Sequence, residues 1–143
     1  MSNLRKLFGT SKSLETEGIW IEYGGSSDAP VRIRVARAGG ANKNFSKTFE
    51  RLSRPYQRAF QTKTIDPELA ERLLAEVYAT AVVLEWQNVT DDEGKAIPLS
   101  KETALKLFLE LPDLFADLRE QASNMALFRE EILEEELGNS GQF

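Results

Sequence analysis

Apolar and polar residues alternate along two neighbouring stretches near the N-terminus. The stretches are GIWIEYGG at 18–25 and VRIRVAR at 31–37, with large apolar side chains at every second position. Such alternation is typical of strands that bury one face. Because the GSSDAP stretch at 25–30 is rich in turn-forming residues, the pattern predicts a β-hairpin over 18–37. A lone hairpin is marginally stable in water, so we expect it to pack on other elements.

The remainder of the chain repeats apolar residues at steps of three and four, which is typical of amphipathic helices. Asn42 or Asn44, Asp66 and Ser100 are residue types that cap helix N-termini, and Pro112 both ends one helix and opens the next. The predicted helices cover about 41–54, 66–86, 100–111 and 113–136. We therefore expect a mainly α fold, in which four or so helices pack as a small bundle with an N-terminal β-hairpin (α+β at the margin).

The segment 66–86 is the most apolar of the predicted helices. After Pro67 it contains no glycine or proline, and its polar residues form a narrow stripe of Glu68, Arg72, Glu76 and Thr80. A helix that is apolar over most of its circumference is usually buried. We expect this helix to be the centre of the fold, with Trp86 at its end.

Both ends of the chain are expected to be less ordered than the middle. Residues 1–16 are interpreted as a flexible segment, 17–137 as one globular domain, and 138–143 as a disordered tail. Five glutamates between 130 and 136 crowd the C-terminal end of the last helix. The helix dipole disfavours negative charge there, so this end should fray.

Composition excludes several kinds of site. The 143 residues include no cysteine and no histidine, so disulfides, thiolate nucleophiles and the commonest zinc ligands are absent. Glycine-rich phosphate loops and G-x-S-x-G motifs are also absent. The acidic stretch DDEG at 91–94 does not fit a calcium loop, because Val89 and Ser100 fall at ligand positions. We expect no catalytic, cofactor-binding or metal-binding residue, and therefore no enzyme.

Charge divides the chain into two halves of opposite sign. Residues 1–63 carry 12 Lys/Arg and 5 Asp/Glu, a net charge of +7, whereas residues 64–143 carry 6 and 18, a net charge of −12. Such a division suits an oppositely charged partner or self-association in which the halves attract, although both halves can equally be solvated surfaces.

Two sets of residues are candidates for binding a partner. One consists of the strand arginines Arg32, Arg34 and Arg37. They belong to a larger basic group with Lys43, Lys47, Arg51, Arg54 and Arg58, beside aromatic residues, which suits a nucleic-acid binder; the overall pI near 4.9 disfavours that class. The other set is Met125, Phe128, Ile132 and Leu133, on an amphipathic stripe near the C-terminus. The first half of that stripe can equally close the core.

A resemblance to a known family rests on residues 77–118. This stretch joins a helix ending in W-x-N-V, an acidic turn with a glycine, an I-P-L-S step and a helix reaching L-P-D-L. The upstream RVARAGGANKNF also looks like the same family. In order and spacing these motifs resemble the tail assembly chaperones of long-tailed, siphovirus-type bacteriophages, and the likeness covers roughly residues 17–135.

The resemblance implies a mainly helical protein without catalytic activity or cofactor. Such chaperones bind the tape measure protein and recruit tail tube subunits in the host cytoplasm, and they are absent from the mature virion. Independently of the resemblance, the division of charge suits self-association, whereas nucleic acid and membranes are not expected partners. Two alternatives stay open: a nucleic-acid-binding module that uses the basic N-terminal half, and a permanent minor structural protein of the tail.

Overall fold

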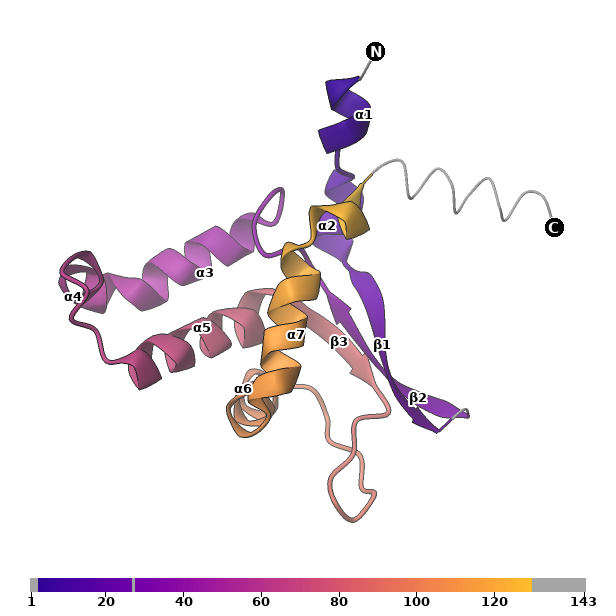
Figure 1. Cartoon of the computed structure of the whole chain (residues 1–143). Helices are drawn as coiled ribbons and strands as arrows, with labels where there is room; N and C mark the ends of the chain where they lie inside the picture. The colour runs from indigo at the N-terminus through magenta and orange to yellow at the C-terminus, as the bar shows by residue number, and fades with distance from the viewer. Residues whose placement is uncertain (1–2, 27, 130–143) are drawn as a thin grey trace.

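A computed structural model of the protein describes residues 3–26 and 28–129 (Figure 1). The α-helices are α1 (Leu4–Phe8), α2 (Lys12–Glu17), α3 (Lys43–Ser53), α4 (Gln57–Gln61), α5 (Pro67–Ala81), α6 (Lys101–Glu110) and α7 (Pro112–Ser123). The 3₁₀ turns are η1 (Arg54–Tyr56) and η2 (Met125–Phe128), and the strands are β1 (Ile19–Ser26), β2 (Ala29–Val35) and β3 (Val83–Gln87). The predicted helix-dominated fold with a small β component is confirmed.

The strands form one antiparallel sheet in the order β1-β2-β3. β1 and β2 are the predicted hairpin, and Ile21 pairs with Ile33, which pairs in turn with Trp86 of β3. A β-bulge interrupts the β1–β2 register between Glu22 and Gly25. Gly24 and Gly25 at this bulge have φ of 90° and 101°, a backbone conformation that residues other than glycine rarely adopt.

The prediction of one helix over 66–86 is wrong in its last part. α5 ends at Ala81, and Val83–Gln87 forms β3, which hydrogen-bonds to β2. The apolar run has no glycine or proline to mark the change, and a short apolar run fits a helix and a strand equally well. The β-branched Val82 and Val83 and the open side of β2 favour the strand.

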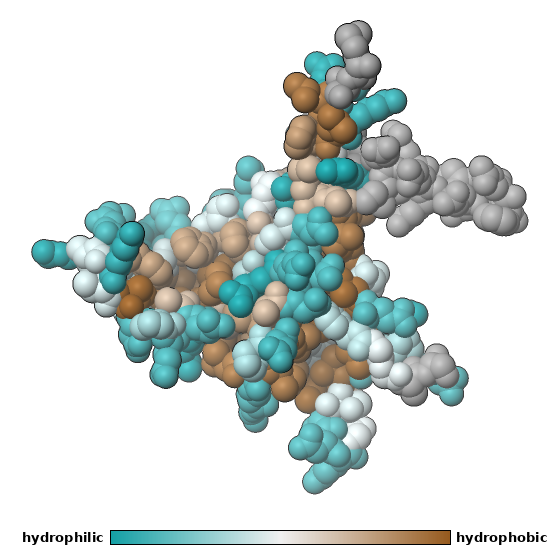
Figure 2. All heavy atoms as spheres, viewed as in Figure 1, coloured by the Kyte–Doolittle hydropathy of each residue, from teal (hydrophilic) through white to brown (hydrophobic). Residues whose placement is uncertain are grey.

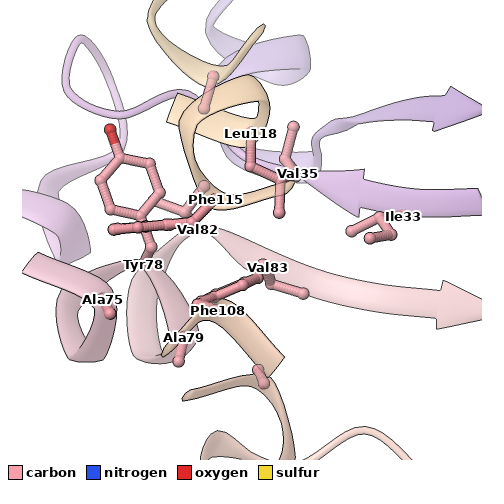
Figure 3. Close-up of a cluster of buried hydrophobic side chains, with 12 residues drawn as sticks. Ile33, Val35, Ala75, Tyr78, Ala79, Val82, Val83, Phe108, Phe115 and Leu118 are labelled. Atoms are coloured by element: carbon pink, nitrogen blue, oxygen red, sulfur yellow. The ribbon is translucent and has the colours of Figure 1, made fainter. Parts of the chain in front are cut away.

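The helices α3, α5, α6 and α7 lie on one side of the sheet, which we call the inner side (Figure 1). The core between them includes Ile33, Val35, Ala75, Tyr78, Ala79, Val82, Val83, Phe108, Phe115 and Leu118 (Figure 3). At the centre of this core, the centroid of the Phe115 ring lies 5.4 Å from that of the Tyr78 ring, in an edge-to-face contact. It lies 5.3 Å from the centroid of the Phe108 ring, in a stacked contact. Aromatic contacts of this kind add to the apolar burial that holds the helices on the sheet.

Asn42 joins the end of the hairpin to the end of α5. It precedes α3 as predicted, but its side chain makes no capping hydrogen bond. Instead its buried Nδ2 donates to the carbonyl oxygens of Arg37, at 2.8 Å, and Ala81, at 2.9 Å. Both carbonyls lie where a regular element has just ended, so the side chain replaces a missing backbone partner.

The prediction of a flexible segment over 1–16 is wrong for its second half. α2 follows a Ser11 cap and buries Glu15 to 2% exposure. Thr10 forms an isolated antiparallel bridge with Arg129, so the beginning of the described chain lies beside its end. Thr10 and Glu15 hold this segment on the body, and α1 extends beyond it (Figure 1).

The last helix is shorter than predicted. α7 ends at Ser123, whereas the sequence predicted a helix over 113–136. Asn124 is extended, and its Oδ1 accepts a hydrogen bond from Ala126 N at 3.0 Å, which starts the turn η2. An asparagine that bonds the following backbone competes with helix continuation. The frayed helix end expected at 130–136 and the tail expected at 138–143 lie outside the described residues.

Candidate interaction site

An apolar pocket of about 220 Å³ opens between the inner side of the sheet and the helices α6 and α7. The strands contribute Tyr23, Val31, Ile33 and Trp86; the segment after β3 contributes Asn88, Val89 and Thr90; and the helices with their junction contribute Leu107, Phe108, Leu111 and Leu114. Leu111 joins α6 to α7 and is 48% exposed, so it stands at the mouth of the pocket. A concave apolar lining with an exposed leucine is suited to holding an apolar side chain of a partner.

The W-x-N-V motif forms one wall of this pocket. Trp86 Nε1 donates to the carbonyl oxygen of Ile97 at 2.9 Å, which fixes the chain beyond β3 against the sheet. Asn88 has φ of 63°, and its Nδ2 donates to the carbonyl oxygen of Pro30 at 2.8 Å. The motif therefore turns the chain and closes the pocket, although the sequence indicated only a helix end.

The acidic stretch is a turn, as predicted. Asp91 Oδ1 accepts hydrogen bonds from the backbone N–H groups of Glu93 and Lys95, both at 2.9 Å, and Gly94 has φ of 79°. The flanking residues Thr90 and Ala96 form an antiparallel bridge, so the chain on the two sides of the turn pairs as a small ribbon. The Asp91 carboxylate is occupied by backbone donors, a role typical of aspartate in turns.

Tyr23 contributes a neutral hydroxyl to the pocket. Burial raises the pKa of this hydroxyl, and the negative charge of the nearby Asp117 carboxylate raises it further. The tyrosine therefore stays neutral at physiological pH, and the pocket walls are otherwise mostly hydrocarbon. Such a lining selects an apolar group over a charged ligand, because burying an unpaired charge is costly.

The arginines Arg32 and Arg34 lie on the outer side of the sheet, away from the pocket. Arg34 stands over the Trp20 ring, 5.9 Å from its centroid, and its guanidinium lies 3.3 Å from the Glu85 carboxylate. It also donates to the carbonyl oxygen of Glu17. Arg32 lies 3.9 Å from Glu22. The outer sheet face therefore presents paired charges around a tryptophan that is 43% exposed.

Arg37 is separated from the other two arginines. It lies beyond β2, and its guanidinium is 3.3 Å from the buried Glu15 carboxylate. That carboxylate also accepts hydrogen bonds from Thr10 Oγ1 and the Ala41 N–H. Arg37 thus holds α2 on the body, which is a structural task, and the three arginines predicted as one set do not form one surface.

The C-terminal set of predicted contact residues is divided in the same way. Phe128 is fully buried in η2, which packs against α2, because the turn after Asn124 directs its ring inward. Its carbonyl oxygen accepts a hydrogen bond from Ser11 N at 2.6 Å. The expectation that Phe128 meets a partner is therefore wrong for the folded chain. Met125 is half-buried, and Ile132 and Leu133 lie outside the described residues.

A second concavity, which we call the acidic groove, lies at the start of α5. Its volume is about 660 Å³, and its lining consists of Asp66, Pro67, Glu68, Leu69, Glu71, Arg72 and Leu109. Leu109 on α6 is 40% exposed. The groove combines apolar side chains with three carboxylates and one guanidinium, so it suits a basic segment that also carries apolar residues.

Sequence reasoning missed the apolar pocket because its residues carry no chemical signal. Tyr23, Val31 and Ile33 lie in the two alternating stretches that predict the hairpin, and Leu107 and Leu114 lie in the predicted helices over 100–111 and 113–136. These positions look like ordinary core positions, yet the core does not close over them completely. The available signal was the exposed Leu111 between two helices, immediately before Pro112.

Neither a metal site nor a membrane span is found in the described part of the chain. No three carboxylates within 3–26 and 28–129 lie close enough to hold a metal ion. No helix of these ranges has the length and hydropathy needed to cross a bilayer.

Comparison with known proteins adds one finding. A family model described as YdaY prophage protein matches residues 40–139, which includes α3, the central α5, the W-x-N-V wall and both α6 and α7. No curated protein and no solved structure matches the chain. The matched region contains most of the apolar pocket and all of the acidic groove.

Proposed function

The chain belongs to the YdaY prophage protein family, and from this premise we propose that it is a tail assembly chaperone of a long-tailed phage. In this role it binds the tape measure protein and recruits tail tube subunits in the host cytoplasm, and it leaves the finished particle. The phage origin and the resemblance of residues 77–118 to such chaperones support the proposal.

The apolar pocket is the observation that carries the proposal. A tape measure protein is long and largely helical, so it presents repeated apolar side chains before the tube surrounds it. A pocket of about 220 Å³ accommodates one large apolar side chain, and the exposed Leu111 extends the contact beyond the mouth. Aromatic and branched side chains in such pockets account for most of the affinity of an interface.

The size of the pocket also suits release. One or two apolar anchors give modest affinity per copy, because association itself costs several kcal/mol. Many copies along one helical partner then bind together, yet each can be displaced by a tube subunit. A chaperone must bind its partner reversibly in this way, whereas a permanent component of the tail needs a larger interface with its neighbours.

A binding experiment with two leucine variants tests the proposal. Leu111→Glu places a charge at the mouth of the apolar pocket, and Leu109→Glu places one in the acidic groove, on another surface. We expect Leu111→Glu to weaken binding of the co-expressed tape measure protein by about 10- to 100-fold, the loss expected when about one apolar side chain is no longer buried. The affinities are compared by calorimetry with purified fragments.

Leu109→Glu is the matched control, because both leucines are similarly exposed and two residues apart. It should leave tape measure binding within about two-fold of wild type, a difference under about 0.5 kcal/mol. Equal loss in both variants would contradict the assignment to the pocket. No binding by the wild-type protein, or its presence in purified virions, would overturn the chaperone function in favour of another role, such as a permanent tail component.

A further inference from the structure

We propose that the N-terminal arm of one copy, α1 (Leu4–Phe8), docks in the acidic groove of a second copy. The proposal identifies two complementary surfaces on one chain. It does not depend on the tape measure partner, since neither surface belongs to the apolar pocket.

The arm exposes its apolar side chains. Leu4, Leu7 and Phe8 are 69%, 43% and 61% exposed, and α1 has no buried residue. In Figure 1 the arm extends beyond the body of the molecule, and in Figure 2 its hydrophobic side chains stand at the surface. Three large apolar residues on a five-residue helix indicate a segment that packs against another surface.

The arm is also basic. It contains Arg5 and Lys6 and no acidic residue. Within residues 3–26 and 28–129, neither cation has a carboxylate within 4.0 Å, in contrast to Arg32, Arg34 and Arg37. Its charges are therefore available to a partner, as are its apolar side chains.

The acidic groove matches the arm in both respects. Leu69 and Leu109 provide apolar surface, and Asp66, Glu68 and Glu71 provide carboxylates, against the single guanidinium of Arg72. Of the three carboxylates, only Glu71 has a cation of the described residues within 4.0 Å, the Arg119 guanidinium. A contact that joins the arm to the groove would bury leucines against leucines and place two cations among three anions.

Geometry excludes docking within one chain. In Figure 1 the arm stands at the top of the molecule, whereas the first turn of α5 lies at the lower left, far from the arm. The contact is therefore intermolecular. Because arm and groove are different surfaces, each copy has a free arm at one end and a free groove at the other, which generates an open head-to-tail assembly. The division of charge along the sequence agrees with this contact, because the basic arm lies in the positively charged half and the acidic groove in the negatively charged half.

Cysteine cross-linking tests the contact directly, because the natural chain contains no cysteine. Full-length Leu7→Cys and Leu109→Cys chains carrying tags of different mass are mixed and treated with a mild oxidant. We expect a disulfide-linked heterodimer. Both residues are exposed, so the substitutions should leave the fold intact, which circular dichroism verifies.

The control pairs Leu7→Cys with Phe49→Cys, since Phe49 is a 43% exposed apolar residue on α3, outside the groove. This pair should give about ten-fold less heterodimer. Raising the salt from about 0.1 M to about 1 M should also reduce the Leu7–Leu109 product, because the Debye length falls from about 10 Å to about 3 Å.

Four results would overturn the proposal. The first three are absence of the Leu7–Leu109 product, equal yields for both cysteine pairs, and sedimentation as a monomer at every concentration, for the wild type as for the double variant Arg5→Glu/Lys6→Glu. The fourth is efficient cross-linking within one chain between Leu7→Cys and Leu133→Cys, which would assign the arm to the chain's own C-terminal segment instead. Tape measure binding is measured in parallel, so failure of this contact and failure of the proposed function are distinguishable.

Discussion

At the scale of single residues, the buried carboxylate of Glu15 shows how the N-terminal segment is held. The carboxylate accepts bonds from Thr10 and the Ala41 N–H and pairs with Arg37. A Cβ at Gly40 would lie 1.9 Å from Glu15 Oε2, so only glycine permits this approach. The A-R-A-G-G-x-N stretch, which the sequence offered as a family motif, is thus the binding loop for one glutamate.

The pH dependence of stability follows from the same group. Burial raises the pKa of Glu15, but the bonds from Thr10 and Ala41 and the charge of Arg37 outweigh it, so the pKa lies below the ordinary 4.5. The ionised form therefore stabilises the folded state above pH 4.5, and this contribution is lost as the pH falls through the lower folded pKa. We expect Glu15→Gln to lower the free energy of unfolding at pH 7 by roughly 1–3 kcal/mol.

Urea unfolding at a series of pH values checks this prediction. The gap between wild type and Glu15→Gln should narrow steadily below pH 4.5, because the wild-type carboxyl also becomes neutral. Glu17→Gln, on the same helix and exposed, serves as the control and should track wild type. A gap that stays constant from pH 7 to the acid limit would contradict the role of ionised Glu15.

At the scale of elements, Asn42 connects three of them. It precedes α3 and bonds the carbonyls of Arg37, beyond β2, and Ala81, at the end of α5. Asn42→Ala should lower the unfolding free energy by roughly 1–3 kcal/mol, since two buried carbonyl groups lose their donor. Asn44→Ala, at an exposed position of α3, should change it by less than about 0.5 kcal/mol. Thermal or chemical denaturation measures the unfolding free energy of each variant. Equal losses in Asn42→Ala and Asn44→Ala would contradict the connecting role of Asn42.

The elements also show how far the sequence predicts the fold. The hairpin and the starts of α5, α6 and α7 were predicted within one or two residues, because alternation, caps and prolines are local signals. The boundary between α5 and β3 was not, because it depends on β2 offering an open side far away in sequence. The end of α7 was missed for another reason. It depends on Asn124, whose side chain accepts a hydrogen bond from the backbone of the turn η2 and so competes with continuation of the helix.

The candidate site was less predictable than the fold. Arg37 and Phe128 looked available as sequence positions, yet one pairs with Glu15 and the other is buried. Whether these two side chains are exposed depends on how α2 packs on the rest of the molecule, and no local sequence pattern predicts that packing. Conversely, the apolar pocket consists of ordinary core residue types, and only the incomplete closure of α6 and α7 over the sheet exposes it.

At the scale of the whole molecule, half of the basic set that suggested nucleic-acid binding is paired with carboxylates. Arg32, Arg34, Arg37 and Arg54 each lie within 4.0 Å of a carboxylate, and the net charge of the chain is −5. We expect no shift of single-stranded or double-stranded DNA at about 0.15 M salt, because the paired arginines are less available to phosphates and the chain is acidic overall.

A gel-shift titration checks this, with the double variant Glu22→Gln/Glu85→Gln as a positive comparison. Removing these two carboxylates frees Arg32 and Arg34 on the outer sheet face and should increase any residual binding. Wild-type binding that weakens steeply with salt would instead support the nucleic-acid alternative.

The bulge in β1 has a consequence for how copies of this protein meet. A regular outer strand offers unpaired N–H and C=O groups on which a neighbouring chain can extend the sheet, the first step toward amyloid-like growth. In β1 the register breaks between Glu22 and Gly25, and two glycines with positive φ bend the strand there. An irregular edge is a poor template, so the bulge disfavours strand-by-strand association of β1 edges when the protein is concentrated.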